Sequence, residues 1–407
     1  MRPATDREHD LLLLGATGYV GRLTAQHLAR QASGIRMALA GRSPERLAAL
    51  RDDLGEAARD WPLVALDVTD LPALNHAVRS TRLLVSTVGP YVRHGLPVVQ
   101  ACAEHGTDYA DLTGETLFAW RSVERAHAQA VRSGARIVHS CGFDSIPSDL
   151  GVGLTAARAA ADEAGTLTAT VLQVRAGRGG ISGGTVDSLR QQAIEVQGDR
   201  ALRQVVADPY ALTGDQAPGR AASSGPLVRR DPHSGRWQAP FVMGGYNRQV
   251  VWRSDALLGR AYGPGFGYRE VIDTGRGPLG AVAAIGVLVA TTALLAGMSV
   301  GPTRRLLDAL LPDPGEGPSE ATRRAGHFRF EVEAGTTSGA RYRTTIAAPY
   351  DPGYGGTAVM LGESALALLQ DPLPERGGVL TPITALGEAL AVRLREQRFT
   401  ITTERLG

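Results

Sequence analysis

The chain has 407 residues, 43% of them hydrophobic, and a formal net charge of +2 at pH 7. This length predicts two or three domains with ample apolar material for a core. A charge this small, without basic stretches interleaved with aromatic residues, argues against a nucleic-acid partner.

Lysine is absent, since all 43 residues in the combined lysine and arginine count are arginine. Mechanisms that require a lysine are therefore excluded, including the Tyr-x-x-x-Lys pair of short-chain dehydrogenases and Schiff-base chemistry. The only cysteines, Cys102 and Cys141, indicate neither a disulfide framework nor structural zinc, and the histidines show no metal-ligand spacing. The polar residues 1–10 do not resemble a secretory signal, so we expect a cytoplasmic protein.

The first predicted strand, residues 10–14, leads directly into the segment G-A-T-G-Y-V-G and then into a helix. A G-x-x-G-x-x-G segment between strand and helix is typical of a dinucleotide-binding fold. Its first glycine permits the tight turn, its second lets the pyrophosphate approach the backbone, and its third lets the helix pack on the strand. A Rossmann-like domain that has lost its ligand is the alternative. The cofactor contacts expected here are Gly15, Thr17, Gly18, Tyr19, Val20 and Gly21.

The second predicted strand, residues 35–40, ends where dinucleotide folds contact the adenosine ribose. An acidic residue there would bind the 2′-hydroxyl of NAD, whereas an arginine accommodates the 2′-phosphate of NADP. Arg42 suits a bidentate phosphate contact and Ser43 offers a further donor, so the sequence predicts NADP(H). Alternatively, both residues form a solvated helix start, with Ser43 as the N-cap before Pro44.

Strands and helices alternate through residue 150, the pattern of a Rossmann-type, doubly wound parallel sheet. Ligands of such sheets lie at the carboxyl ends of the strands. Asp67 could equally cap the helix that follows it. The predicted strands are residues 10–14, 35–40, 63–66, 83–87, 109–111 and 136–139. The further cofactor contacts expected at strand ends are Asp67, Val68, Val88, Gly89, Pro90, Cys141, Gly142 and Phe143.

After Gly151 the pattern changes. We predict an NADP-binding Rossmann domain at 1–150, an inserted α+β substrate or dimerisation domain at 151–352, and C-terminal helices at 353–407 that return to the first domain. The later elements expected are strands at 167–176, 328–334 and 341–347, helices at about 185–207, 356–369 and 383–396, and a long loop at 214–240.

Residues 277–303 carry no charge, and the centre of this stretch, 279–298, has the roughly twenty residues that a transmembrane helix needs. About half of the centre is Ala, Gly and Thr, so insertion is marginal. Arginines flank both ends, and a complete span would split the second domain. We expect a hydrophobic helix that lies on or dips into a membrane, or that covers a tunnel for an acyl chain. A buried core or dimer helix is the alternative.

Four segments together carry a resemblance: residues 15–21 (G-A-T-G-Y-V-G), 89–91 (G-P-Y), 106–115 (G-T-D-Y-A-D-L-T-G-E) and 141–149 (C-G-F-D-S-I-P-S-D). The chain resembles the saccharopine dehydrogenase-like oxidoreductases, and within them the branch of trans-acting enoyl reductases of lipid and polyketide assembly. The resemblance covers most of the chain and implies reduction with a nicotinamide cofactor. Saccharopine-forming relatives are expected to use a lysine with a histidine, so the missing lysine disfavours amino-acid chemistry.

Reduction of a polarised C=C bond needs hydride at the β-carbon, a donor for the enolate oxygen and a proton for the α-carbon. Tyr91 is the first candidate donor. Asp144 and Ser145 follow, either to polarise a carbonyl or to orient the nicotinamide. The alternatives are that Tyr91 only packs against the nicotinamide, that Cys141 is a small buried apolar residue, and that Ser145 or Ser148 caps a helix.

Two histidines lie close to predicted strand ends. His94 could face the cleft and titrate near neutral pH. His139, inside the sixth strand, is expected in the core with its ring nitrogens hydrogen-bonded.

The sequence thus predicts an NADPH-dependent reductase of a C=C bond in an apolar acyl or lipid-like substrate, carried by an acyl carrier protein or a polyketide synthase. A carrier partner requires a basic surface, which scattered arginines could supply. A homodimer and a peripheral position at a membrane are compatible with this hypothesis. The alternatives are a non-catalytic NADP-binding sensor or scaffold and a saccharopine-type, imine-reducing amino-acid dehydrogenase. The arginines considered are Arg220, Arg229, Arg230, Arg236, Arg248 and Arg253.

Overall fold

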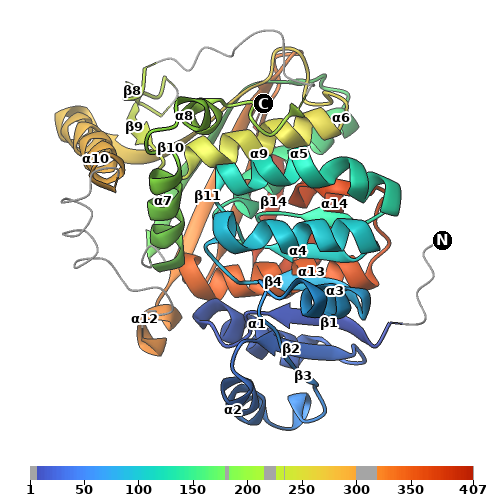
Figure 1. Ribbon diagram of the computed structural model, residues 1–407. Coiled ribbons are helices and arrows are strands. Elements are labelled where there is room, and N and C mark those ends of the chain that lie inside the picture. Colours follow the sequence, from blue (N-terminus) through green and yellow to red (C-terminus); the bar gives the residue numbers. More distant parts are fainter. Residues whose placement is uncertain (1–6, 179–182, 215–225, 233, 299–318, 407) are drawn as a thin grey trace.

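The computed structural model describes residues 7–178, 183–214, 226–232, 234–298 and 319–406, which build two sheets (Figure 1). Sheet A has the strand order β13-β6-β5-β4-β1-β2-β3, and sheet B the order β14-β12-β11-β7-β10-β9-β8. All pairings in sheet A are parallel, and helices cover both of its faces. The predicted Rossmann-type sheet with a second, mixed α/β part and an apolar helix is confirmed.

The strands of sheet A are short and almost entirely buried, and β1 pairs with β2 and β4 on its two sides. Leu11, Leu12 and Leu13 are fully buried. Because both faces of the sheet are covered, its strands read as continuous apolar runs. The strands are β1 (His9–Leu14), β2 (Met37–Gly41), β3 (Leu63–Ala65), β4 (Thr81–Ser86), β5 (Asp108–Asp111), β6 (Arg136–Val138) and β13 (Gly378–Leu380).

The helices between these strands complete the Rossmann layers. Helices α3, α4 and α5 pack side by side, whereas α1 packs against α13 from the C-terminal part of the chain. A buried contact of 2.8 Å between His27 Nε2 and Glu363 Oε1 ties α1 to α13. These elements are α1 (Tyr19–Gln31), α2 (Pro44–Leu54), the 3₁₀ turn η1 (Gly55–Ala58), α3 (Leu71–Arg79), α4 (Tyr91–His105), α5 (Thr116–Ser133) and α13 (Thr357–Gln370).

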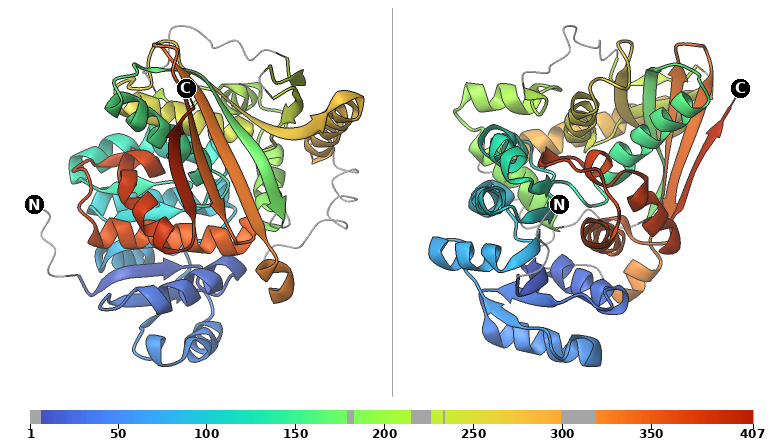
Figure 2. Two further views of the ribbon diagram at one scale, coloured as in Figure 1. Left: turned by 180° about the vertical axis from the view of Figure 1, so that it is seen from behind. Right: turned by 90° about the vertical axis from the view of Figure 1, so that its right-hand side faces the viewer.

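Sheet B has one buried and one open face. On β11, Phe328, Phe330 and Val332 are buried, while Glu331 and Glu333 alternate with them. Helices α6 (Ile146–Ala161) and α9 (Gly244–Leu257) pack on the buried face, and within the described part of the chain no helix covers the other face (Figure 2, left). The strands are β7 (Leu167–Arg178), β8 (Arg229–Arg230), β9 (Arg236–Pro240), β10 (Gly267–Arg276), β11 (His327–Thr336), β12 (Arg341–Ala348) and β14 (Thr400–Arg405).

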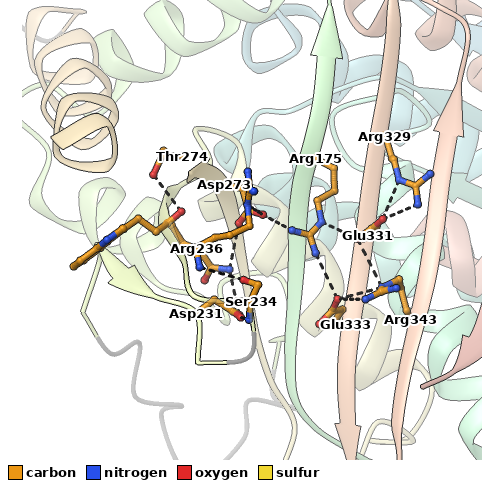
Figure 3. Close-up of polar contacts among 12 residues, drawn as sticks. Arg175, Asp231, Ser234, Arg236, Asp273, Thr274, Arg329, Glu331, Glu333 and Arg343 are labelled. Carbon is orange, nitrogen blue, oxygen red and sulfur yellow. Dashed lines mark hydrogen bonds and ion pairs between the residues drawn. The ribbon is translucent and has the colours of Figure 1, made fainter. Parts of the chain in front are cut away.

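A row of ion pairs runs across the open face of sheet B (Figure 3). Arg175 on β7 bonds to Asp273 on β10 and, at 2.7 Å, to Glu331 on β11. Arg343 on β12 reaches Glu333 at 2.8 Å. Cross-strand pairs of opposite charge of this kind stabilise neighbouring strands.

The last 55 or so residues contribute to both sheets. The turn η3 (Pro352–Gly356) leads into α13, β13 extends sheet A beside β6, α14 (Pro382–Glu396) packs on α6 and α13, and β14 pairs with β12 in sheet B. Neither β13 nor β14 was predicted. The division proposed at residue 150 falls inside α6, which begins beyond β6 and packs under sheet B.

Two predictions for the second half need correction, and three further elements there were not predicted. The helix expected at 185–207 is two helices, α7 (Gly183–Glu195) and α8 (Arg200–Ala207), because Asp199 accepts a bond from Leu202 N and starts a new helix. Residues 214–240 include β8 and β9, although 215–225 lie outside the described residues. Helix α9 and strand β10 were not predicted. The short helix α12 (Glu320–Arg324) precedes β11.

Helix α10 (Gly277–Met298) follows β10 directly and projects from the body beside β9 and α7 (Figure 1). Among the described residues it is the helix that is long and apolar enough to cross a membrane, judged by length and composition. Residues 299–303, the end of the uncharged stretch, lie outside the described residues.

Candidate functional site

A cleft of about 190 Å³ opens at the carboxyl ends of the sheet A strands. Its walls come from the turn after β1, the loops after β4, β5 and β6, helix α7, the start of α9 and the η3–α13 turn. The lining residues are Gly18, Tyr19, Val20, Gly21, Thr87, Gly89, Pro90, Tyr91, Leu112, Gly114, Gly142, Phe143, Asp144, Asp187, Ser188, Leu189, Met243, Gly353, Tyr354 and Thr357. This is where a doubly wound sheet binds its ligand.

The glycine turn has the geometry of a phosphate site. Gly15 adopts φ +83°, a conformation that L side chains rarely adopt. A Cβ on Gly21 would lie 2.2 Å from the Gly15 carbonyl oxygen, so no side chain fits between helix α1 and this turn. No side chain caps the start of α1, and its first turn holds no acidic residue. The N–H groups of that turn therefore suit the pyrophosphate of a dinucleotide.

The predicted adenosine end gathers Arg42, Asp67 and His94. Arg42 is exposed at the end of β2, next to β3 in the sheet. Bonds from Thr69 lower the pKa of Asp67, and the charges of Arg42 and His94 lower it further. His94 is half-buried at this end of the site and does not line the cleft.

Local hydrogen bonds settle two capping alternatives. Ser43 Oγ accepts a bond from Arg46 N at 3.3 Å and is the N-cap of α2, as the alternative interpretation proposed. Asp70, and not Asp67, caps α3 by accepting a bond from Ala73 N. Asp67 instead holds the turn at Thr69.

The remaining predicted contacts lie at different depths. Gly89, Pro90, Gly142 and Phe143 line the cleft, whereas Thr17, Val68 and Val88 belong to neighbouring turns and the core. Cys141 is fully buried, contacts the Val138 carbonyl at 3.6 Å, and has its pKa raised by burial. Its side chain therefore belongs to the core and does not reach the cleft.

Tyr91, the first catalytic candidate, lies with its ring along the cleft. The ring stacks on Phe118, with centroids 5.5 Å apart, and the hydroxyl donates to the Ser86 carbonyl at 2.9 Å. Burial, with the charge of Asp111, raises the pKa of Tyr91 well above its ordinary value. The hydroxyl is thus engaged with the backbone of β4, which favours the packing alternative over proton donation.

Ser145 is also engaged behind the cleft wall. Its hydroxyl donates to Asn247 Oδ1 at 2.9 Å, and Asn247 Nδ2 donates to Glu270 Oε2 at 3.0 Å. Ser148 and Tyr268 donate to the other Glu270 oxygen at 2.6 and 2.7 Å. Burial raises the pKa of Glu270. Ser145 occupies the N-cap position of α6 but makes no side-chain cap bond, so the capping alternative does not account for its hydroxyl.

Asp144 is the carboxylate among the three catalytic candidates, and it lines the cleft. It lies between the nucleotide half and the buried Ser145–Asn247–Glu270 chain, and its charge contributes to the raised pKa of Glu270.

A second buried carboxylate, Glu115, joins helix α4 to helix α7. It accepts bonds from Tyr91 N at 2.9 Å and Val92 N at 2.6 Å, and Ser188 Oγ donates to it at 2.7 Å. Burial raises its pKa although these bonds oppose the shift. Glu115 thus holds Tyr91 in place and anchors the wall formed by α7.

His139 is a core residue, as predicted. Its Nδ1 contacts Asp111 Oδ2 at 2.8 Å and its Nε2 contacts Ser122 Oγ at 2.7 Å. Ser140, at φ +66°, bonds to Tyr246 at 2.6 Å behind the cleft. Among the residues that the structure describes, no three His, Cys, Asp or Glu side chains form a group that could hold a metal.

The sequence did not predict the cleft residues that come from the second half of the chain. Tyr354 packs edge-on against Tyr19 with centroids 4.7 Å apart, and Thr357 accepts a bond from Phe143 N at 3.2 Å. Met243 and residues 187–189 close the other sides. The glycine-rich run D-P-G-Y-G-G at 351–356, which resembles a ligand-binding turn, is the signal that could have found Tyr354.

Comparison with known proteins identifies the family of this chain. Residues 11–138 match the model of the saccharopine dehydrogenase NADP binding domain. Over 99% of both chains, the protein is 43% identical to a trans-acting enoyl reductase of Mycobacterium ulcerans strain Agy99, and it is 43% identical over the full length to that of Mycobacterium tuberculosis strain H37Rv. The chain belongs to the trans-acting enoyl reductase family.

As a member of this family, the protein is an NADP-dependent oxidoreductase that uses NADP(H). The solved structure of apo saccharopine dehydrogenase (L-Glu forming) from Saccharomyces cerevisiae covers 98% of this chain and 100% of its own, with a TM-score of 0.55 at 14% identity. That likeness concerns the fold alone. The uncapped start of α1, the close contact at Gly21 and Arg42 at the end of β2 fit a bound NADP(H).

Proposed function

We propose that this reductase saturates the C=C bond of an apolar α,β-unsaturated acyl thioester that a separate carrier protein or polyketide synthase presents to it. The observation that carries the proposal is the composition of the cleft. A phosphate-type glycine turn forms one end, and the rest of the lining is mostly apolar or aromatic, with the carboxylates Asp144 and Asp187. The names of the relatives, trans-acting enoyl reductases, support the same substrate class.

When bound, NADPH supplies hydride. The residues of this chain would hold and orient it: the turn at residues 15–21 would receive the phosphates, Arg42 the 2′-phosphate, and the Tyr91 ring, Pro90 and Phe143 the nicotinamide end. Leu112, Met243 and Tyr354 exclude water from the acyl group. Reduction adds hydride to the β-carbon and a proton to the α-carbon, and Asp144 is the cleft side chain placed to deliver or relay that proton.

Purified protein with NADPH and a panel of enoyl thioesters of increasing chain length tests the proposal through nicotinamide absorbance. We expect NADPH oxidation that depends on the enoyl thioester. Tight NADPH binding without oxidation by any member of the panel would contradict it and would favour a sensor or scaffold.

Two substitutions assign the proton donor. We expect Asp144→Asn to lower kcat about a hundredfold or more, within the range for general acid–base groups, with NADPH affinity unchanged. The matched control is Asp187→Asn, another cleft aspartate, which pairs with Arg190. Tyr91→Phe should keep kcat within a few-fold, whereas a loss of about a hundredfold would make Tyr91 the donor.

A further inference from the structure

Helix α10 presents an unbroken apolar face to solvent. Leu279, Val282, Ile285 and Val289, spaced three or four residues apart, are 84%, 68%, 54% and 60% exposed. The opposite side of the helix packs against β9, β10 and α7, where Ala284 is fully buried. Neither side carries a charged residue, so the exposed face lacks the charges that a solvated helix carries.

Arginines lie on the segments next to this helix. Arg229, Arg230 and Arg236 lie on the β8–β9 hairpin against which α10 packs, and the exposed Arg276 directly precedes the helix. We call these four residues the arginine rim. The two acidic side chains beside them, Asp231 and Asp273, are largely turned inward, and Asp273 is shared between Arg175 and Arg236. Figure 3 shows Arg236 and Asp273 between α10 and the ion-pair row.

Trp237 lies between helix α10 and the arginine rim. Trp237 on β9 packs against the first turn of α10, and its Cδ1 would lie 3.2 Å from a Cβ on Gly280. Thr274 bonds to the Trp237 and Gly280 carbonyls and fixes this junction. An apolar helix with tryptophan and arginines along its border is the pattern of a segment at a membrane–water interface.

The topology forbids a complete crossing. Before α10, β10 pairs with β7 and β9; after it, β11 pairs with β7 in the same sheet. Both ends of the helix therefore stay on one side of any bilayer. In sequence, residues 299–318 include Arg304, Arg305 and Asp308, charges that a membrane-spanning segment rarely carries. The helix can lie in the plane of the interface without breaking sheet B.

A second copy of the chain fits this face less well. Because a two-fold contact pairs this patch with itself, the partner would offer the arginine rim only an apolar helix and further arginines, and no negative charge. An anionic bilayer offers both an apolar layer for α10 and negative charge for the rim.

We propose that α10 and the arginine rim dock this protein on the surface of an anionic phospholipid bilayer, with α10 lying in the plane of the interface. The proposal does not depend on the enzymatic activity. Since α7 touches α10 and residues 187–189 of α7 line the cleft, docking brings the cleft close to the membrane.

Co-flotation with vesicles tests the proposal. We expect the full-length protein to float with phosphatidylglycerol–phosphatidylcholine vesicles at least tenfold more than with pure phosphatidylcholine, and to detach as salt rises. Ile285→Glu with Val289→Glu should abolish flotation while leaving NADPH binding unchanged. The matched control is Leu71→Glu on α3, because Leu71 is 53% exposed and thus comparable to Ile285. Arg230→Gln with Arg276→Gln should remove the preference for anionic lipid.

Three results would overturn the proposal. The first is absence of wild-type protein from both kinds of vesicle. The second is flotation that the α10 double variant retains. The third is a stable dimer, seen by light scattering, that the same double variant dissociates while no vesicle binding occurs, because a second copy would then cover α10.

Discussion

The two sheets of this protein have similar size but opposite chemistry. Sheet A is covered on both faces, and its central strands are apolar runs such as residues 11–14. Sheet B is covered on one face, and its open face carries charged pairs such as Arg175 with Glu331. Sheet A thus supports the cofactor site with strands that are buried on both faces. Sheet B is stabilised in addition by ion pairs on its open face.

The sheets also differ in how their strands meet. In sheet A, β1 to β6 are joined by short helical crossovers, which is the local arrangement of a doubly wound fold. In sheet B, β7 pairs with β11, about 160 residues later in the chain. We therefore expect changes in sheet A to affect binding and changes in sheet B to affect stability alone. The predictions below test this difference, from the largest expected effect to the smallest.

Gly21→Ala should abolish useful NADPH binding. The new Cβ would meet the Gly15 carbonyl oxygen, and the required backbone shift costs on the order of 3 kcal/mol, or about a hundredfold in affinity. Fluorescence titration with NADPH measures this loss of affinity. The control in sheet B is Gly177→Ala, where a Cβ meets nothing within 4 Å, and its affinity should equal that of the wild type. If NADPH affinity fell equally in both variants, the two sheets would not differ in their effect on cofactor binding.

Arg175→Ala should lower the free energy of unfolding by about 2 kcal/mol without changing NADPH affinity. The substitution takes one partner from the buried Asp273 and Glu331, which keep other arginines. Urea denaturation gives the stability. Arg59→Ala, which breaks an exposed pair with Glu56, is the control and should change stability by less than about 0.5 kcal/mol. If both variants lost a similar free energy of unfolding, the contacts of Arg175 would contribute no more to stability than an exposed ion pair.

Arg42→Ala should weaken NADPH about ten- to a hundredfold and NADH little, because only NADPH has the 2′-phosphate. Titration with both nucleotides measures the ratio. If the two affinities fall equally, Arg42 does not read the phosphate. Arg46, whose guanidinium bonds to the Thr17 carbonyl at 3.2 Å, would then be the next residue to replace.

Asp10 at the start of β1 gives the smallest expected effect and a defined pH dependence. Burial alone would raise its pKa, but bonds from Arg36 and Arg82 outweigh burial and lower it to about 2. A carboxyl with a lowered folded pKa stabilises the fold above its unfolded value of about 4, and this contribution disappears as pH falls through about 2. Asp10→Asn should therefore cost about 1 to 2 kcal/mol at pH 7 and much less near pH 2. A loss that is the same at both pH values would exclude the ionic origin.

The sequence was sufficient for the parts of the fold that depend on neighbours in the chain. The strands β1 to β6, the turn at Gly15 and the core position of His139 follow from local patterns of apolar residues and glycine. Strands β13 and β14 could not be predicted, because each is short and exists only through a partner far away in the sequence, β6 or β12.

The same reason explains the candidate site. Its nucleotide half was predicted from one continuous segment at residues 15–21, but Ser188, Met243 and Tyr354 join the cleft only through tertiary packing. The roles of Tyr91 and Ser145 were overestimated because their hydrogen-bond partners, the Ser86 carbonyl and Asn247, are visible only in three dimensions.

The chain end completes both sheets, since β13 closes one edge of sheet A and β14 one edge of sheet B. During synthesis these strands emerge from the ribosome after the other strands of their sheets, so neither sheet can reach its described width before residues 378–405 have emerged. Until then the nascent chain must keep two open sheet edges apart from other chains. A stalled or prematurely terminated product would present both edges at once, which makes it a substrate for chaperones or proteases and not a smaller working enzyme.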